Sequence, residues 1–238
     1  MIFENINYKH INNNKKNLIV FLHGWGCNMK SFSFFERFFL FDYDVLNIDL
    51  YGFGMSLLPE GEFGIYEYAK NIFMLIKMLN YEKITIVSHS FGFRIAIILS
   101  SCFDLNIVKM IVTGGAGLKP RFNLITKSKI FFYKLIKKFK INCVLGSLDY
   151  KNSDERLRKV FLKVVNQHLD FLLPKIKCFM MMFWGDKDLA TPLYMAKRIL
   201  KKVEFCELKI VRGSHFVFME NKLLFVDESL RFIKWCNK

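Results

Sequence analysis

The chain has 238 residues, of which 53% are hydrophobic and 27 are phenylalanine. This composition excludes a disordered protein, and the length suits one domain with an insertion. The longest apolar runs are far shorter than the roughly 18 residues that a membrane-spanning helix needs. The first residues contain no apolar stretch followed by a small-residue cleavage site, so we expect a cytoplasmic protein.

The chain is strongly basic, with 36 Lys and Arg against 21 Asp and Glu and a formal net charge of +15. Such a charge can attract nucleic acid, an anionic membrane surface or an acidic ligand. No nucleic-acid-binding motif accompanies it, so no nucleic acid partner is expected, and a lysine-rich composition imposed by genome base content explains the charge more simply. The six cysteines form no C-x-x-C pair and do not cluster with the five histidines, so no metal site is indicated.

The first half of the chain alternates between two patterns. Short apolar segments that end in glycine or small residues are predicted as buried strands, at residues 17–24, 44–52, 83–88 and 108–115. Apolar residues follow helical spacing between these segments, at residues 64–79 and 91–101. Strands and helices in alternation predict a parallel sheet with helices on both faces.

The pattern changes between residues 119 and 173. Residues 119–140 are basic and amphipathic, and residues 153–173 read as a helix with Ser153 as its N-cap and Pro174 after its end. The alternation then resumes, with strands predicted at 177–186 and 206–214 and helices at 191–203 and 222–236. We therefore predict an α/β core formed by residues 1–118 and 174–238, interrupted by a helical cap at residues 119–173.

One sharp turn separates the strand and the helix of the stretch KITIVSHSFGFRIAIILSS, residues 83–101. Functional groups of an open parallel sheet gather at the carboxyl ends of its strands, and Ser90 lies just past one such end. A serine on a tight turn projects its hydroxyl above the sheet edge, while the N–H of Phe91 at the helix start is free to face an incoming oxygen. Strand and helix backbones nearly touch there, which suits Gly92; Ser88 stands where glycine is usual.

The pentapeptide S-H-S-F-G resembles the nucleophile elbow, G-x-S-x-G, of the α/β-hydrolase superfamily. The chain as a whole resembles the branch of serine esterases with a small helical lid, and is similar to small carboxylesterases and to hydrolases of ring-cleavage products. Further stretches that resemble the family follow in the same order as in its members: LHGWGCN (22–28), DLYGFGMS (49–56), WGDKDLATP (184–192) and GSHFVFME (213–220). The resemblance implies an α/β-hydrolase fold, with the N–H of Trp25 as a second oxyanion donor. It also implies a catalytic triad of Ser90, Asp188 and His215.

Other polar residues near these motifs remain as alternatives. Asp186 competes with Asp188 for the role of the triad carboxylate. His23 and His89 lie inside turn motifs, where packing or loop hydrogen bonding is the expected role. No strand is followed by G-x-G-x-x-G, so no organic cofactor is expected.

The predicted function is hydrolysis of a carboxylic ester or thioester of a small acyl substrate, through an acyl-enzyme on Ser90. A carbon–carbon bond hydrolase of the same fold, or a ligand-binding protein without turnover, is the alternative.

The basic cap sequence raises a separate question about a partner. In residues 119–140, the apolar side chains at helical spacing are expected to face the core or the pocket: Phe132, Leu135, Ile136 and Phe139. Lysines then lie toward the periphery: Lys134, Lys137, Lys138 and Lys140. A solvated lid face accounts for them. The alternative is a lid that receives an anionic substrate, an acyl carrier or a membrane surface.

Overall fold

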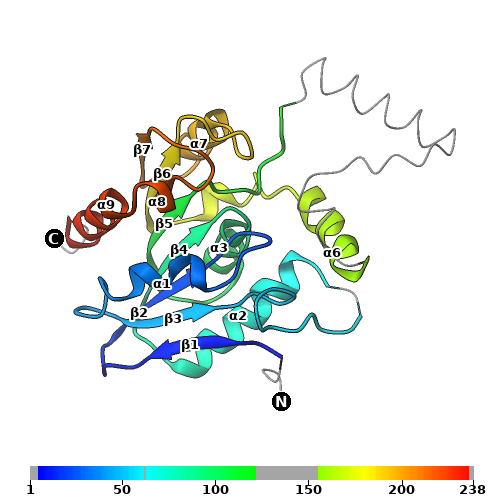
Figure 1. Cartoon of the computed structure of the whole chain (residues 1–238), viewed down its shortest axis with the longest axis horizontal. Coiled ribbons are helices and arrows are strands. Elements are labelled where there is room, and N and C mark those ends of the chain that lie inside the picture. Colours follow the sequence, from blue (N-terminus) through cyan, green and yellow to red (C-terminus); the bar gives the residue numbers. More distant parts are fainter. Residues whose placement is uncertain (1–4, 62, 122–154, 236–238) are drawn as a thin grey trace, which may run out of the picture.

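The computed structural model describes residues 5–61, 63–121 and 155–235. These residues form a seven-stranded sheet in the order β1-β3-β2-β4-β5-β6-β7 (Figure 1). The strands are β1 (Tyr8–Ile11), β2 (Asn17–Leu22), β3 (Asp44–Ile48), β4 (Lys83–His89), β5 (Ile107–Thr113), β6 (Phe179–Gly185) and β7 (Cys206–Val211). Strand β1 pairs antiparallel with β3, and every other neighbouring pair is parallel. The mostly parallel α/β sheet predicted from the sequence is therefore confirmed.

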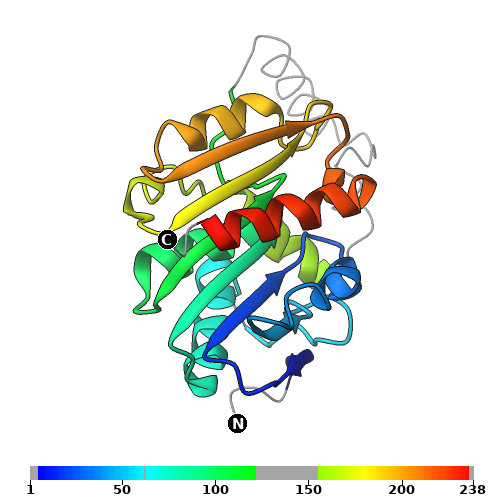
Figure 2. The same ribbon diagram turned by 90° about the vertical axis from the view of Figure 1, so that its left-hand side faces the viewer.

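Helices cover both faces of the sheet (Figure 2). They are α1 (Lys30–Glu36), α2 (Ile65–Leu79), α3 (Phe91–Cys102), α6 (Glu155–Asn166), α7 (Leu193–Leu200), α8 (Val217–Glu220), α9 (Lys222–Trp235) and the 3-10 helix η1 (Leu173–Lys175). Buried side chains of α2, α3, α6 and α7 belong to one apolar cluster, and those of α1, α8 and α9 belong to a second.

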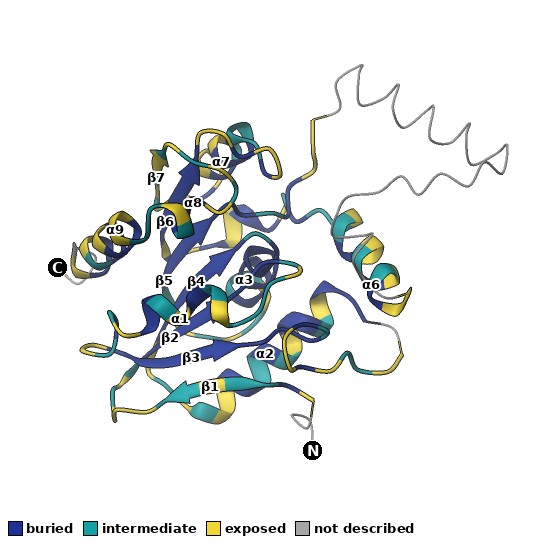
Figure 3. Cartoon of the chain, viewed as in Figure 1, coloured by how far each residue is buried: buried dark blue, intermediate teal, exposed yellow. Residues whose placement is uncertain are grey.

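The two clusters lie on opposite faces of the sheet because side chains of a strand alternate between its faces. In β2, Leu18, Val20 and Leu22 belong to the first cluster, whereas Ile19 and Phe21 belong to the second. The central strands are buried on both faces, while the edge strands β1 and β7 are partly exposed (Figure 3). The sheet is thus the middle layer of three.

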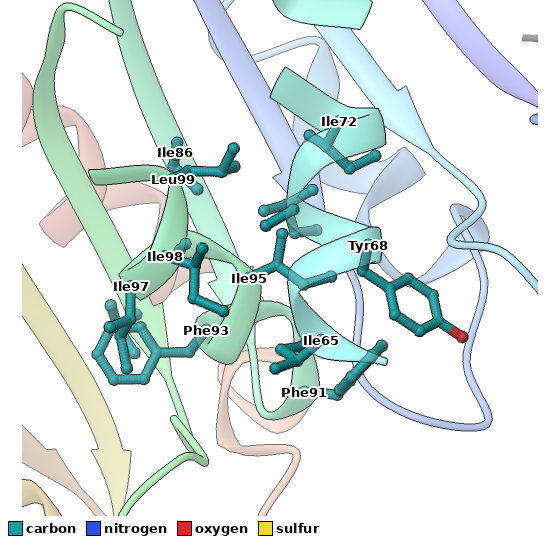
Figure 4. Packing of buried hydrophobic residues seen from close by; sticks show 14 of the residues in the cluster. Ile65, Tyr68, Ile72, Ile86, Phe91, Phe93, Ile95, Ile97, Ile98 and Leu99 are labelled. Atoms are coloured by element: carbon teal, nitrogen blue, oxygen red, sulfur yellow. The ribbon is translucent and has the colours of Figure 1, made fainter. Parts of the chain in front are cut away.

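Helix α3 is buried on nearly all sides, since every residue from Phe91 to Leu99 is buried. It packs between β4 and α2, and Figure 4 shows Phe91 next to Ile65 of α2, with Ile95 between the two helices. A helix surrounded in this way has little room to shift, because protein interiors are close-packed. The turn that begins α3 is therefore held on a rigid support.

The structure also contains elements that the sequence pattern did not predict. Strand β1 and helix α1 were not expected, and the helix predicted over residues 153–173 ends at Asn166. Beyond Asn166 the backbone turns toward the core, because Leu169 donates its N–H to the carbonyl of Gly117 over 2.8 Å. Most of the basic stretch 119–140 lies outside the described residues, and so do all of its predicted apolar and lysine faces.

The described ends of the predicted cap lie next to each other. Besides the bond between Leu169 and Gly117, the carboxylate of Asp170 accepts the N–H of Lys119 over 2.7 Å and pairs with Arg198 of α7. The chain segments before and after the predicted cap are thus joined to each other, between the end of β5 and the start of β6. The boundaries at residues 119 and 173 stay a prediction. Within the described part of the chain, no helix has the length and apolarity needed to cross a membrane.

Candidate active site

Ser90 forms the turn between β4 and α3 in a strained conformation. Its φ is 47° and its ψ is −107°. A positive φ in a residue other than glycine costs about 1–3 kcal/mol, and such residues persist only where their surroundings hold them. Here the N–H of Ser90 donates to the carbonyl of Thr113, and the N–H of Ala116 donates to the carbonyl of Ser90, each over 3.1 Å. Two bonds to the segment around the end of β5 therefore fix the serine.

Glycine at positions 92 and 24 leaves room for the close approach of neighbouring groups near Ser90. A Cβ atom on Gly92 would lie 2.1 Å from the carbonyl oxygen of Leu22, at the end of β2. A Cβ atom on Gly24 would lie 2.7 Å from Cδ2 of His89. Ser88 is fully buried, and its hydroxyl has no hydrogen-bond partner among the residues that the structure describes. The expected requirement for a small residue at Gly92 is thus a steric one.

Asp188 and His215 come together from the loops that follow β6 and β7. Nδ1 of His215 lies 2.8 Å from Oδ2 of Asp188. In the neutral ring this contact places the proton on Nδ1 and leaves Nε2 as the basic nitrogen. The same carboxylate accepts the backbone N–H groups of Ala190 and Thr191 at Oδ1, over 2.9 and 2.8 Å. The imidazole is therefore held by a carboxylate that is itself fixed.

The pKa of Asp188 lies below its usual value. Burial acts to raise the pKa of this carboxyl, but hydrogen bonds and charge attraction from His215 and hydrogen bonds from Thr191 together outweigh burial. Asp188 is thus ionised at neutral pH, as a carboxylate that stabilises a protonated imidazole must be.

Asp186 has a different position from Asp188. It is exposed, and its Oδ1 accepts the N–H of Gly213 over 2.9 Å. It therefore joins the loop after β6 to the loop that carries His215. The structure places Asp188, and not Asp186, in hydrogen-bond contact with His215.

Ser90 and His215 line one cavity of about 470 Å³. Among the contacts of the described residues, no hydrogen bond joins the Ser90 hydroxyl to the His215 ring. Catalytic hydrogen bonds are often long in the absence of substrate. Much of the wall is apolar, and the ring of Trp25 packs edge-on against Phe91 and Phe161, with centroids 5.1 and 5.0 Å apart. The cavity can hold an apolar acyl group beside Ser90.

The two residues predicted as oxyanion donors also line this cavity. Phe91 is the first residue of α3, so its N–H has no acceptor within the helix. Trp25 lies in a turn that Cys27 closes by donating its N–H to the carbonyl of Gly24 over 3.2 Å. Their catalytic role stays a prediction.

His23 and His89 are buried beside the site and are held by backbone groups. His23 contacts the carbonyl of Gly24 through Nδ1 over 2.7 Å and accepts the N–H of Leu50 at Nε2 over 2.9 Å. Nδ1 of His89 lies 3.0 Å from the carbonyl of Thr113. Burial lowers the pKa of His23 to about 4, and burial together with the neighbouring His215 lowers the pKa of His89 to about 3. Both rings are neutral, in agreement with the expected packing role.

Some residues of the site were not predicted from the sequence. Thr191 lies three residues after Asp188 and donates its hydroxyl hydrogen to the Asp188 carboxylate. That spacing alone does not predict a role in the site. Arg94 is the one charged residue of the apolar helix α3, a signal that could have been used. Phe161 and Val164 enter the cavity from α6, far along the chain, and only the fold reveals them.

A family model described as alpha/beta hydrolase fold matches residues 17–135. The chain belongs to the alpha/beta hydrolase fold family. The match covers β2 to β5, and so includes the turn at Ser90. Among curated proteins, an uncharacterized protein of Mycobacterium tuberculosis is 20% identical over 254 residues, which cover 90% of this chain and 74% of that protein.

Solved structures share the alpha/beta hydrolase fold over nearly the whole chain. A lipase-esterase related protein from Clostridium acetobutylicum is 24% identical with a TM-score of 0.72, covering 96% of this chain and 99% of its own. An esterase from Exiguobacterium antarcticum is 19% identical with a TM-score of 0.76, covering 96% and 95%. A meta-cleavage product hydrolase from Pseudomonas fluorescens is 17% identical with a TM-score of 0.72, covering 96% and 94%. These similarities show the fold.

Proposed function

We propose that the protein is a serine hydrolase that cleaves a carboxylic ester or thioester through an acyl-enzyme on Ser90. The observation that carries the proposal is the sharing of one cavity by the strained Ser90 and by His215, whose Nδ1 is held by Asp188. A serine hydroxyl is a poor nucleophile at neutral pH and needs such a base.

The proposed reaction follows from these positions. Nε2 of His215 takes the proton of Ser90 while Oγ attacks the acyl carbon, and the carbonyl oxygen becomes an oxyanion. The N–H groups of Trp25 and Phe91 stabilise the oxyanion, each by about 3–4 kcal/mol. The intermediate then expels the alcohol or thiol, which receives the proton from His215. Water attacks the acyl-enzyme by the same route and releases the acid.

Labelling with a fluorophosphonate probe tests the nucleophile directly. We expect the protein to be labelled at Ser90 and the Ser90→Ala variant to stay unlabelled. On p-nitrophenyl esters and acyl thioesters of graded chain length, Ser90→Ala and His215→Ala should each lose several orders of magnitude in kcat. Members of a triad act as a unit, so the double variant should lose no more than the single ones.

Ester turnover by Ser90→Ala within about tenfold of the parent would exclude Ser90 as the nucleophile. Labelling of Ser90 without turnover of any ester or thioester would instead favour a carbon–carbon bond hydrolase. A protein that is neither labelled nor active is a binding protein that keeps the cavity.

A further inference from the structure

Arg94 lies in the same cavity as Ser90 and His215, yet the proposed reaction does not use it. It follows Ser90 by four residues on α3, which separates the two along the helix by one turn, about 6 Å. It is 7% exposed. Burial lowers the pKa of its guanidinium to about 10, so the group remains charged at neutral pH.

The hydrogen bonds of Arg94 satisfy one part of its guanidinium group. Nη1 donates to the carbonyls of Val164 and Gln167 over 2.9 and 2.7 Å, at the carboxyl end of α6. Within the described part of the chain, Nε and Nη2 have no hydrogen-bond partner, and no carboxylate forms an ion pair with Arg94. Neither of these two nitrogens is completely shielded from solvent. They remain able to bind another group.

Burying a cation without a counter-ion costs a large amount of free energy. Helix carbonyls offset part of this cost, but a charged group taken out of water normally pairs with an opposite charge. Of the described residues that line the cavity, Arg94 alone carries a permanent charge. One guanidinium matches one negative charge, and its planar edge of two N–H donors fits the two oxygens of a carboxylate.

We propose that Arg94 binds a free carboxylate of the substrate, so that the protein acts on half-esters or half-thioesters of dicarboxylic acids. This inference rests on the proposed function. The ester carbonyl lies at Ser90 while the distant carboxylate pairs with Nε and Nη2 of Arg94. The apolar side chains of the cavity contact the methylene chain between the two ends.

Matched substrates test this specificity. Monoethyl adipate carries the free carboxylate, and the ethyl ester of adipic acid monoamide has the same shape without the charge. We expect the parent protein to prefer the acid by about tenfold or more in kcat/KM, through KM, since a hydrogen bond to a charged group is worth that much. Arg94→Met should lose this preference and keep its activity on the amide. 5-Acetoxypentanoate carries the carboxylate on the leaving alcohol and should not be preferred over its amide; a preference there as large as that for monoethyl adipate would contradict a site for half-esters of dicarboxylic acids.

Arg156 supplies the matched control. It lies on the same helix as Val164, is exposed, and also donates to backbone carbonyls, those of Leu58 and Pro59. Arg156→Met removes the same charge and should leave the preference for the acid intact. Arg94→Lys should retain part of the preference, because it keeps the charge but not the planar edge. Arg94→Met could instead lose the same fraction of kcat/KM on the acid and on the amide, with Arg94→Lys equally impaired. That result would show that Arg94 only holds α6 in place.

A binding experiment separates this inference from the proposed function. Adipate should raise the melting temperature of the Ser90→Ala variant, adipamide should not, and Arg94→Lys in that background should weaken the adipate effect. If adipate stabilises through Arg94 while Ser90 resists the fluorophosphonate probe, the anion site stands and the hydrolase proposal falls. If Ser90 is labelled but adipate has no effect on melting, the carboxylate site is wrong.

Discussion

Thr191 donates its hydroxyl hydrogen to the same oxygen of Asp188 that faces His215. Its Oγ1 and Nδ1 of His215 each lie 2.8 Å from Oδ2 of Asp188. The hydroxyl also lies 3.3 Å from Nδ1 of His215. Thr191 therefore helps to fix the oxygen that contacts the imidazole, and in the proposed reaction it would act through Asp188.

Replacing Thr191 by valine keeps the shape of the side chain and removes this hydrogen bond. We expect kcat for the best ester of the panel to fall by about tenfold with little change in KM, since a hydrogen bond to a charged group is lost. Thr191→Ser, which keeps the hydroxyl, should stay within about threefold of the parent. Equal loss in both variants would assign Thr191 to packing.

Asp188→Asn and Asp186→Asn should differ sharply. The first should lower kcat by about 10³- to 10⁴-fold, because an amide favours the wrong tautomer of His215 and does not stabilise its protonated form. Asp186→Asn should keep kcat within about tenfold of the parent value, because the asparagine oxygen still accepts the N–H of Gly213. The same ester assay serves for both, and a dead Asp186→Asn beside an active Asp188→Asn would reverse the assignment.

Gly92→Ala should destabilise the fold by about 3 kcal/mol or more, since its new methyl group meets backbone that cannot move away. The nearest atom is the carbonyl oxygen of Leu22, at 2.1 Å. Gly64→Ala is the control, because a Cβ there meets flexible side-chain atoms of Glu67 and Lys163, no closer than 3.1 Å. Gly64→Ala should lower the free energy of unfolding by less than about 1 kcal/mol. Urea unfolding measures both, and a Gly92→Ala protein as stable as the parent would refute the close contact.

Stability should fall as the pH drops below the ordinary histidine value of 6.5. The pKa values of His23 and His89 are about 4 and about 3 in the folded chain, because both are buried. The unfolded chain therefore binds protons first, and the stability from the neutral rings, complete above pH 6.5, is lost on acidification. Each ring should contribute a slope approaching about 1.4 kcal/mol per pH unit.

Urea unfolding between about pH 7 and about pH 5 measures this slope. His89→Asn is the informative variant, because its amide can still donate to the carbonyl of Thr113 but cannot take up a proton. Its slope should be smaller than that of the parent by the contribution of one histidine. An unchanged slope would mean that His89 is not titrated on unfolding.

The sequence predicted the strands that are buried on both faces, because their runs of Ile, Val, Leu and Met fit few other environments. It missed β1, a four-residue, half-exposed edge strand, because its sequence YKHI contains only one residue of aliphatic character. Helix α1 was also missed, because Met29 at its N-cap makes no side-chain hydrogen bond and so does not indicate where the helix begins. Short elements held mainly by tertiary contacts carry little local signal.

The end of α6 and the site residues show the same limit. Nothing in the sequence after Asn166 forbids another helical turn; the helix ends where Arg94 takes the carbonyls of Val164 and Gln167. Ser90, Asp188 and His215 could be predicted because each lies in a motif that resembles the family's own. Thr191 lies in no pattern that singles it out, and the lone charge of Arg94 in an apolar helix indicates an unusual residue without showing that the fold brings it into the cavity of Ser90.

The hydrogen bond between Gly117 and Leu169 has a consequence for how this protein can vary. Gly117 follows the end of β5 by four residues and Leu169 precedes β6 by ten, so this bond joins the parts of the core on either side of the segment between them. Lengthening a surface loop costs little free energy, as the entropy of closure grows only with the logarithm of its length. Exchange of residues 120–166 for those of a relative would also replace α6, so the new sequence must supply the apolar side chains that Leu157, Val160 and Val164 bring to the first cluster. Such an exchange changes Phe161 and Val164 in the cavity wall beside Ser90 and leaves the sequences of the Asp188 and His215 loops unaltered.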